Sequence, residues 1–165
     1  MVEANGGSFR FVVGDAVRLP VQAASFDLVL TMEMIEHVPA WRSFLAEAAR
    51  VLRRGGRLII STPTRAGFHS WLKRGWHALT GWEKVNRACL RGEGTDYERF
   101  LAKTEVIAAA DTAGLSLEAT KVRIFVFSFI PPWLFGPNWL AEQVLERTPG
   151  LRELGVCRFY RFRKR

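Results

Sequence analysis

The sequence predicts an α/β domain with a mostly parallel sheet and an antiparallel pair of strands at its C-terminal end. Three segments in fixed order predict this fold: Val13–Ala16, then Phe26–Leu30 leading to Glu36–Val38, and then Leu52–Ile60. Each is a strand edge or strand entry followed by polar residues. Open α/β sheets build ligand sites from this layout, at the carboxyl ends of their strands.

The first two predicted strands are short apolar runs. Phe9–Val13 ends at Gly14, and Phe26–Leu30 follows a polar stretch. Continuous apolar runs of this length are typical of strands that are covered on both faces, as in parallel sheets. We therefore expect both strands to be buried.

A helix and a third strand are predicted next. Apolar side chains recur at helical spacing, at Trp41, Phe44, Leu45, Ala48, Ala49 and Leu52. Gly55–Gly56 can end this helix because glycine adopts positive φ at little cost. Arg57–Ser61 is then predicted to be a buried strand. Strand, helix and strand in this order indicate parallel strands joined by a crossover helix.

The second half of the chain has a different pattern. Phe68–Leu79 has the spacing of a basic amphipathic helix interrupted by a glycine, and Thr104 can cap a helix that ends at Gly114. Leu115–Ser128 is β-branched and aromatic, which predicts one or two strands. A short helix over residues 139–147 and a final strand near residues 156–162 complete the chain, and the last two strands can pair antiparallel.

Length and composition favour one soluble domain. The chain has 165 residues, 48% of them hydrophobic, which is enough to bury a core. No run approaches the roughly 18 apolar residues of a membrane span. The N-terminus carries Glu3 and no basic-then-apolar run, so it lacks the pattern of a signal peptide. We expect a cytoplasmic protein.

Cysteines and histidines do not form a metal-binding pattern. Cys89 and Cys157 lie far apart, and His37, His69 and His77 have no Glu-x-x-His or cysteine partner at ligand spacing. The sequence therefore predicts a protein without a metal site or a disulfide framework.

Taken together, these segments resemble the middle and end of a class I S-adenosylmethionine-dependent methyltransferase, closest to the type 11 small-molecule group that includes quinone-biosynthesis enzymes. The resemblance is carried by Gly14-Asp15-Ala16, by Glu33–Val38 and by Leu52–Pro63. It is close over about residues 9–63 and extends beyond them only in the order of elements. It implies a Rossmann-like sheet and methyl transfer from S-adenosylmethionine to a small, lipophilic acceptor.

The resemblance implies a set of cofactor-binding residues. Asp15 would accept a hydrogen bond from the adenine amino group, with Gly14 before it and Ala16 beside the ring. Thr31, Met32 and Glu33 would face the methionine part of the cofactor or the acceptor. The residues also allow simpler interpretations, because Asp after Gly commonly caps a turn and Met32 can be ordinary core.

His37 and two tryptophans are candidates on the acceptor side. His37 can take a proton near neutral pH and is the candidate catalytic base, although a structural histidine bonded to the backbone is the alternative. Trp71 and Trp76 lie among basic residues and can shelter a lipophilic substrate or rest on a membrane surface. Packing of this helix on the domain is the competing interpretation.

We divide the chain into a cofactor-side core (1–63), a substrate-cover insertion (64–100) and a C-terminal helix with a strand pair (101–165). A complete family member begins with a strand, a Gly-x-Gly-x-Gly loop and a second strand, and these segments are absent. Their loss would leave a gap in the sheet at the binding crevice. We therefore expect a truncated form, with completion by another chain or a degenerate module as alternatives.

The net charge of +8 raises a second functional hypothesis, a non-catalytic basic module that binds a membrane surface or nucleic acid. No helix-turn-helix, zinc or RNP pattern appears, so nucleic acid is not the expected partner. The expected partners are a small-molecule methyl acceptor and, through the tryptophans, a peripheral membrane contact.

Overall fold

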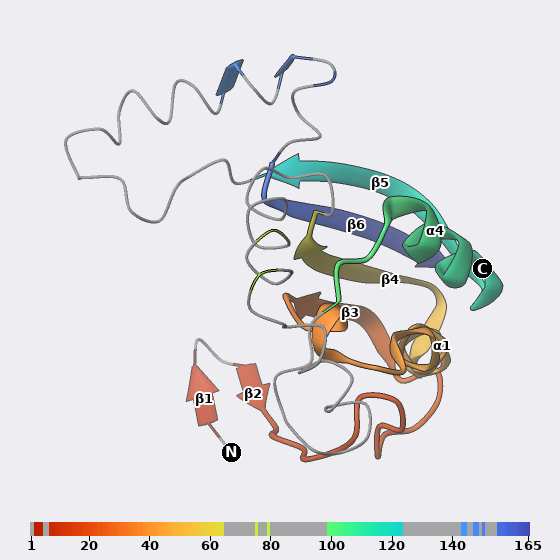
Figure 1. Ribbon diagram of the computed structural model, residues 1–165. Helices are drawn as coiled ribbons and strands as arrows, with labels where there is room; N and C mark the ends of the chain where they lie inside the picture. Colours follow the sequence, from red (N-terminus) through yellow and green to blue (C-terminus); the bar gives the residue numbers. More distant parts are fainter. Residues whose placement is uncertain are drawn as a thin grey trace.

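The computed structural model describes residues 2–4, 7–64, 75, 79, 99–123, 143–144, 147–148, 150 and 155–165. Its elements in chain order are β1 (Val2–Ala4), β2 (Gly7–Phe9), β3 (Phe26–Met32), the 3₁₀ helix η1 (Ile35–His37), α1 (Trp41–Val51), β4 (Leu52–Pro63), α4 (Lys103–Thr112), β5 (Leu115–Arg123) and β6 (Cys157–Lys164) (Figure 1). Strands β1 and β2 form a separate two-stranded antiparallel sheet.

The main sheet has four strands in the order β3-β4-β6-β5. Strands β3 and β4 are parallel, whereas β6 is antiparallel to both β4 and β5. The α/β class and the antiparallel C-terminal pair are therefore confirmed. Strand β6 lies between β4 and β5, so the last strand of the chain reaches the middle of the sheet (Figure 1).

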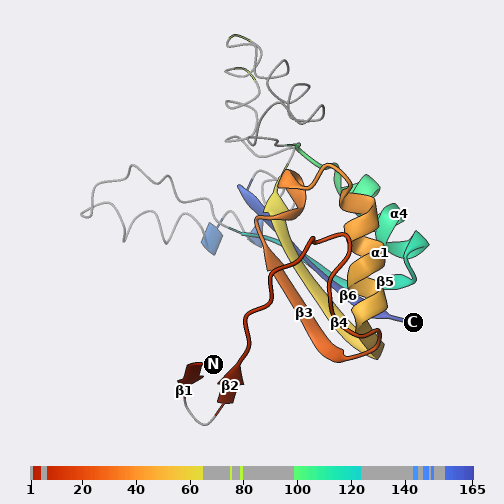
Figure 2. The same cartoon turned by 90° about the horizontal axis from the view of Figure 1, so that it is seen from below.

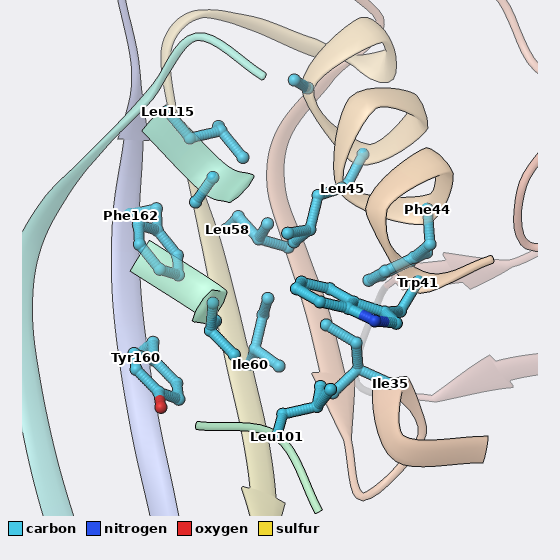
Figure 3. Close-up of a cluster of buried hydrophobic side chains, with 14 of the residues drawn as sticks. Ile35, Trp41, Phe44, Leu45, Leu58, Ile60, Leu101, Leu115, Tyr160 and Phe162 are labelled. Carbon is cyan, nitrogen blue, oxygen red and sulfur yellow. The ribbon is translucent and has the colours of Figure 1, made fainter. Parts of the chain in front are cut away.

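Helices α1 and α4 cover one face of this sheet, and no helix of the described residues covers the opposite face (Figure 2). The core lies between these helices and the sheet. Trp41, Phe44 and Leu45 of α1 meet Leu58 and Ile60 of β4 there (Figure 3). The apolar spacing predicted over residues 41–52 is confirmed, because every side chain that it named is buried.

Strand β3 is the end strand of the main sheet, and its burial differs from the prediction. Leu28 and Leu30 are 52% and 60% exposed, on the face that α1 leaves uncovered. The predicted strand Phe9–Val13 is also wrong, because β2 ends at Phe9 and residues 10–13 form no strand. Phe11 and Val13 are 86% and 99% exposed. An apolar run becomes a buried strand only where a neighbouring strand and a covering layer exist, and neither is present in the described part of the chain.

The helix ends agree with the prediction in part. Helix α1 ends at Val51, one residue before the predicted Leu52. Gly55–Gly56 do not end this helix as predicted, because β4 begins at Leu52 and contains both glycines, with Gly55 at φ +80°. The strand predicted at Arg57–Ser61 is present within β4, which begins at Leu52. Helix α4 ends before Gly114, which has φ +82°. Its first turn is not capped by Thr104 as predicted. The Glu105 carboxylate instead accepts a hydrogen bond of 3.0 Å from the amide of Ala102, because Ala102 is the residue with extended backbone before the helix.

Several predicted elements lie largely or wholly outside the described residues. These are the amphipathic helix at 68–79 with Trp71 and Trp76, the end of the strand predicted at 115–128, and the short helix at 139–147. None of the helices in the described ranges is long and apolar enough to cross a bilayer.

Candidate functional site

The carboxyl ends of the parallel strands β3 and β4 lie side by side, with Met32 opposite Ser61. Of the predicted residues here, Thr31 is buried and its hydroxyl has no hydrogen-bond partner in the described part of the chain, whereas Met32 is 49% exposed. Met32 is thus not an ordinary core residue, which was the simpler interpretation. Ligand sites of open α/β sheets form at such adjoining strand ends.

Glu33 follows β3 directly and has φ +47°, a left-handed conformation that is uncommon outside glycine. Its amide donates to the Ser61 carbonyl oxygen at 3.1 Å. Its carboxylate Oε1 accepts from Ser61 Oγ at 2.8 Å and from Cys157 Sγ at 2.9 Å. Strained backbone that is held by several contacts is characteristic of functional sites.

Ser61 and Cys157 were not among the residues predicted for the site. Ser61 was placed only as the end of a strand, and Cys157 was considered only as a metal or disulfide candidate. Cys157 reaches Glu33 because β6 pairs with β4, with Pro63 opposite Cys157. The local sequence around position 157 contains no signal for this contact.

The Cys157 thiol is expected to resist alkylation in the folded chain. Burial, the hydrogen bond to Glu33 and the charge of Glu33 together raise the pKa of Cys157 to about 12. Only about one thiol in ten thousand is then ionised at pH 8, against roughly a quarter for an ordinary cysteine, and only the thiolate reacts. In a Cys89→Ser background, iodoacetamide should modify native Cys157 at least a hundredfold more slowly than the urea-unfolded chain, as measured by mass spectrometry.

The matched variant is Glu33→Gln in the same background. It keeps the shape of the side chain and removes the charge that disfavours the thiolate, so alkylation should become faster while remaining slower than in the unfolded chain. Equal rates for the native and unfolded chains would contradict the described environment of Cys157.

Glu36 lies in η1, beside these strand ends, and is only 2% exposed. Burial has the largest effect and raises the pKa of its carboxyl. A hydrogen bond from its own backbone lowers this pKa, the charge of Glu33 raises it by less, and Thr62 and His37 lower it least. Within the described residues neither the Thr62 hydroxyl nor Glu36 Oε2 meets the geometry of a full hydrogen bond, but Thr62 lies close enough to act on the carboxyl as a weak donor. Glu36 was used only as part of a sequence motif, so its burial was missed.

His37 is the last residue of η1, and its side chain is 55% exposed. Its Nε2 lies 4.0 Å from Glu36 Oε1. The predicted base, His37, therefore lies next to the buried carboxyl of Glu36, near the carboxyl ends of β3 and β4.

Asp15 lies in an exposed turn between β2 and β3. Its Oδ1 accepts a hydrogen bond of 3.0 Å from the amide of Val17, and its carbonyl oxygen accepts one from the amide of Arg18. This is the turn-capping interpretation of Asp15, and the adenine contact stays a prediction. Gly14 packs against Pro20 so closely that an added Cβ would lie 2.5 Å from Pro20 Cδ, while Ala16 packs against the core cluster.

Helix α1 holds the loop that follows Asp15. The Glu47 carboxylate accepts a hydrogen bond of 2.7 Å from the amide of Leu19, and Arg50 donates to the carbonyl oxygens of Leu19 and Val21. Glu47 and Arg50 also pair at 2.8 Å, and the bond from Arg50 lowers the pKa of the Glu47 carboxyl. The polar face of α1 thus fixes a loop that the sequence left unplaced.

No group of three or more potential metal ligands occurs among the described residues. The geometry instead offers carboxylates, hydroxyls and a histidine at the end of a parallel strand pair, beside a loop anchored on α1. Open α/β sheets bind organic ligands at strand ends arranged in this way.

Comparisons with known proteins show which domains this chain is similar to. Residues 2–60 match the family model described as a methyltransferase domain. Malonyl-[acyl-carrier protein] O-methyltransferase of Hahella chejuensis is 39% identical over 106 residues, which are 64% of this chain and 33% of that protein. Ubiquinone biosynthesis O-methyltransferase of Cupriavidus pinatubonensis is 36% identical over 58% of this chain and 36% of its own length.

Solved structures agree with this result. A SAM-dependent methyltransferase of Thermotoga maritima matches with a TM-score of 0.59 and 25% identity, over 94% of this chain and 64% of that chain. A SAM-dependent methyltransferase of Methanosarcina mazei has a TM-score of 0.63 over 98% of this chain and 69% of that chain, and at 15% identity it supports the fold alone.

The resemblance to class I S-adenosylmethionine-dependent methyltransferases, inferred from the motifs, is confirmed by these matches, and so is the Rossmann-like fold class. The matched relatives are named as O-methyltransferases of ubiquinone biosynthesis and of malonyl-[acyl-carrier protein]. The chain spans about a third of the length of these curated relatives.

Proposed function

We propose that this chain forms part of an S-adenosylmethionine-dependent O-methyltransferase and supplies the later half of its site, from the turn at Asp15 to the ends of β3 and β4. The observation that carries this proposal is the fixed, strained Glu33 at the end of a parallel strand pair, held by Ser61 and Cys157. The cofactor supplies the methyl group on a sulfonium, so the protein's tasks are binding, orientation and removal of a proton.

The described residues fit such a cofactor. Met32 is half exposed at the end of β3 and can contact a ligand there, and next to it lies the buried Thr31 hydroxyl, which has no hydrogen-bond partner among the described residues. Asp15 and Ala16 lie in a turn whose following loop α1 anchors, which suits a fixed contact with the adenine. Glu33 would face the methionine part or the acceptor. His37, half exposed beside Glu36, would take the acceptor proton.

The acceptor proposed is small and lipophilic. Residues 64–100 would form its cover, with Trp71 and Trp76 against it, and these residues lie largely outside the described part of the chain. A peripheral membrane contact through the same tryptophans would give access to a lipophilic acceptor. The tryptophan variants Trp71→Ala and Trp76→Ala test this contact by liposome sedimentation.

Cofactor binding is proposed to need a further strand with a glycine-rich loop next to β3. Strand β3 ends the described sheet, with Leu28 and Leu30 exposed beside that edge. In the resembled family, the strand with the Gly-x-Gly-x-Gly loop belongs at this place, either in the same polypeptide or on a second chain.

Calorimetric titration with S-adenosylmethionine tests the proposal on two polypeptides. One is this chain, and the other carries in addition an N-terminal strand and glycine-rich loop taken from the upstream gene region or grafted from the Hahella relative. We expect weak or no binding by this chain and binding by the extended one. An Asp15→Ala substitution should weaken the latter, whereas Asp111→Ala, on exposed α4, should not. Tight binding by the short chain would refute the need for a further strand and glycine-rich loop. Absence of binding by both polypeptides would refute S-adenosylmethionine as the cofactor.

A basic module that binds membrane surfaces or nucleic acid was the alternative hypothesis. The relatives named above are all methyltransferases, and the comparisons give the alternative no support.

A further inference from the structure

Glu33 is an exposed residue whose side chain is held by two residues from other strands. Its carboxylate Oε1 accepts from Ser61 Oγ of β4 at 2.8 Å and from Cys157 Sγ, at the start of β6, at 2.9 Å. Ser61 and Cys157 are 0% and 3% exposed, whereas Glu33 is open to solvent. A surface carboxylate is therefore fixed by two donors that are themselves buried in the sheet.

The backbone of Glu33 is fixed as well. Its amide donates to the Ser61 carbonyl oxygen and to Ser61 Oγ, each at 3.1 Å. Ser61 Oγ thus accepts from the amide and donates to the carboxylate of the same residue. These bonds hold the Glu33 φ at +47°, where glycine or asparagine would be less strained. A carboxylate held at this cost in backbone energy is characteristic of a residue that meets a ligand.

The two donors orient the carboxylate without neutralising it. A hydroxyl and a thiol carry no charge, and the Cys157 thiol stays protonated because burial and the contact with Glu33 raise its pKa to about 12. Both donors reach Oε1, so Oε2 is the oxygen that can turn toward a ligand. An oriented carboxylate that keeps its charge attracts a positively charged group.

We propose that Ser61 and Cys157 are positioning residues, which hold the Glu33 carboxylate for the positively charged methionine part of S-adenosylmethionine. This inference rests on the proposed methyltransferase function. The methionine part carries an ammonium and a sulfonium group, and ligands of open α/β sheets bind at strand ends such as those of β3 and β4. Cys157 acts only through Glu33, so the last strand of the chain contributes to the site without contacting the ligand.

A purely structural role for Cys157 leads to a different expectation. If the thiol only fills space in the sheet, its removal changes stability and affects ligand affinity independently of Glu33. If the thiol acts through Glu33, its removal lowers affinity only while the carboxylate is present. Cys157→Ser also separates the two roles, because serine is smaller but supplies a hydroxyl donor at the same place.

Calorimetric titration of the extended polypeptide with S-adenosylmethionine measures this coupling. The test variants are Glu33→Gln, Cys157→Ala, Cys157→Ser, Ser61→Ala and the double variant Glu33→Gln/Cys157→Ala. Ser116→Ala is the matched control, because it removes a side-chain hydrogen bond to the Arg163 carbonyl oxygen, at the other end of β6. Thermal unfolding of each variant confirms that it is folded.

We expect Glu33→Gln to lose about tenfold in affinity, because a charged acceptor is replaced by a neutral one, and Cys157→Ala and Ser61→Ala to lose about fivefold. The double variant should bind about as weakly as Glu33→Gln alone, since the second substitution removes a donor that no longer has a carboxylate to hold. Cys157→Ser and Ser116→Ala should stay within about twofold of the unmodified polypeptide.

A second measurement needs no cofactor. Three-bond couplings in this chain, labelled with ¹⁵N and ¹³C, report the side-chain rotamers of Glu33. One rotamer should dominate in the unmodified chain, in Cys157→Ser and in Ser116→Ala. Averaging among rotamers should increase in Cys157→Ala, because one of the two donors to Oε1 is lost.

Five results would overturn the inference. Three are affinities: an unchanged value in Glu33→Gln, an unchanged value in Cys157→Ala, and losses that add in the double variant. The others are a Cys157→Ser variant as weak as Cys157→Ala, and Glu33 rotamers that are the same with and without the thiol. The affinities are compared with an unmodified extended polypeptide that binds the cofactor. Absence of that binding would instead refute the proposed function, and the rotamers would still test the positioning of Glu33.

Discussion

A Trp41→Ala variant is expected to lose about 3–5 kcal/mol of unfolding free energy, the usual cost of removing a large buried aromatic side chain. Trp41 is 1% exposed and lies in the cluster between α1 and the sheet (Figure 3). Because domains are stable by only about 5–15 kcal/mol, this loss amounts to between roughly a fifth and the whole of the unfolding free energy. Urea titration followed by circular dichroism measures the change.

Trp41→Phe is the matched control. It keeps an aromatic ring in the cluster and removes the indole N–H, which is buried without a hydrogen-bond partner among the described residues. We expect a cost below about 1.5 kcal/mol. A loss under 1 kcal/mol for Trp41→Ala would show that α1 does not hold the sheet through this side chain.

A Glu36→Gln variant is expected to be more stable than the unmodified chain at pH 8, by about 1 kcal/mol, because it removes a charge that is buried without a full set of donors. For a domain of this size such a gain corresponds to an increase in Tm of roughly 2–4 °C. Thermal unfolding at several pH values measures it.

The pH dependence of this gain follows from the direction of the pKa change. The folded pKa of Glu36 is raised above its unfolded value of 4.5. The protonated carboxyl therefore stabilises the fold below pH 4.5, and this contribution is lost as the pH rises through the folded pKa. The advantage of the variant should be large at pH 8 and vanish near pH 4. An equal advantage at both pH values would show that the carboxyl is not buried as described.

The sequence predicted best those features that depend on local pattern. The apolar positions of α1 follow the helical repeat, and Gly114 marks the end of α4 because positive φ favours glycine. The strands β4 and β6 could also be found from local pattern, because each contains a run of residues typical of strands. Each of these signals lies within about ten residues of the element that it predicts.

Features that depend on distant partners were not predictable. Phe11 and Val13 form an apolar run, but burial needs a neighbouring strand and a covering layer, which no local pattern contains. The contact between Glu33 and Cys157 joins residues 124 positions apart and follows from the place of β6 in the sheet. Glu36 had to be placed against Thr62 before its burial could be known.

Gly56 shows how a residue far from the strand ends determines what meets there. At the start of the pairing, β4 runs so close to β3 that a Cβ on Gly56 would lie 3.1 Å from the Asp27 carbonyl oxygen and 2.9 Å from that of Arg53. The register is irregular up to this point and then unbroken from Leu28 opposite Arg57 to Met32 opposite Ser61.

This close approach fixes the register of the β3–β4 pair. A slip of one residue would put Ile60 or Thr62 in the place of Ser61 and turn its hydroxyl to the other face, so Glu33 would lose the serine that bonds to it. In the sequence the paired glycines seem only to end a helix. In the structure Gly56 sets the register, and the register determines that Ser61, five residues further along β4, is the side chain that meets the Glu33 carboxylate.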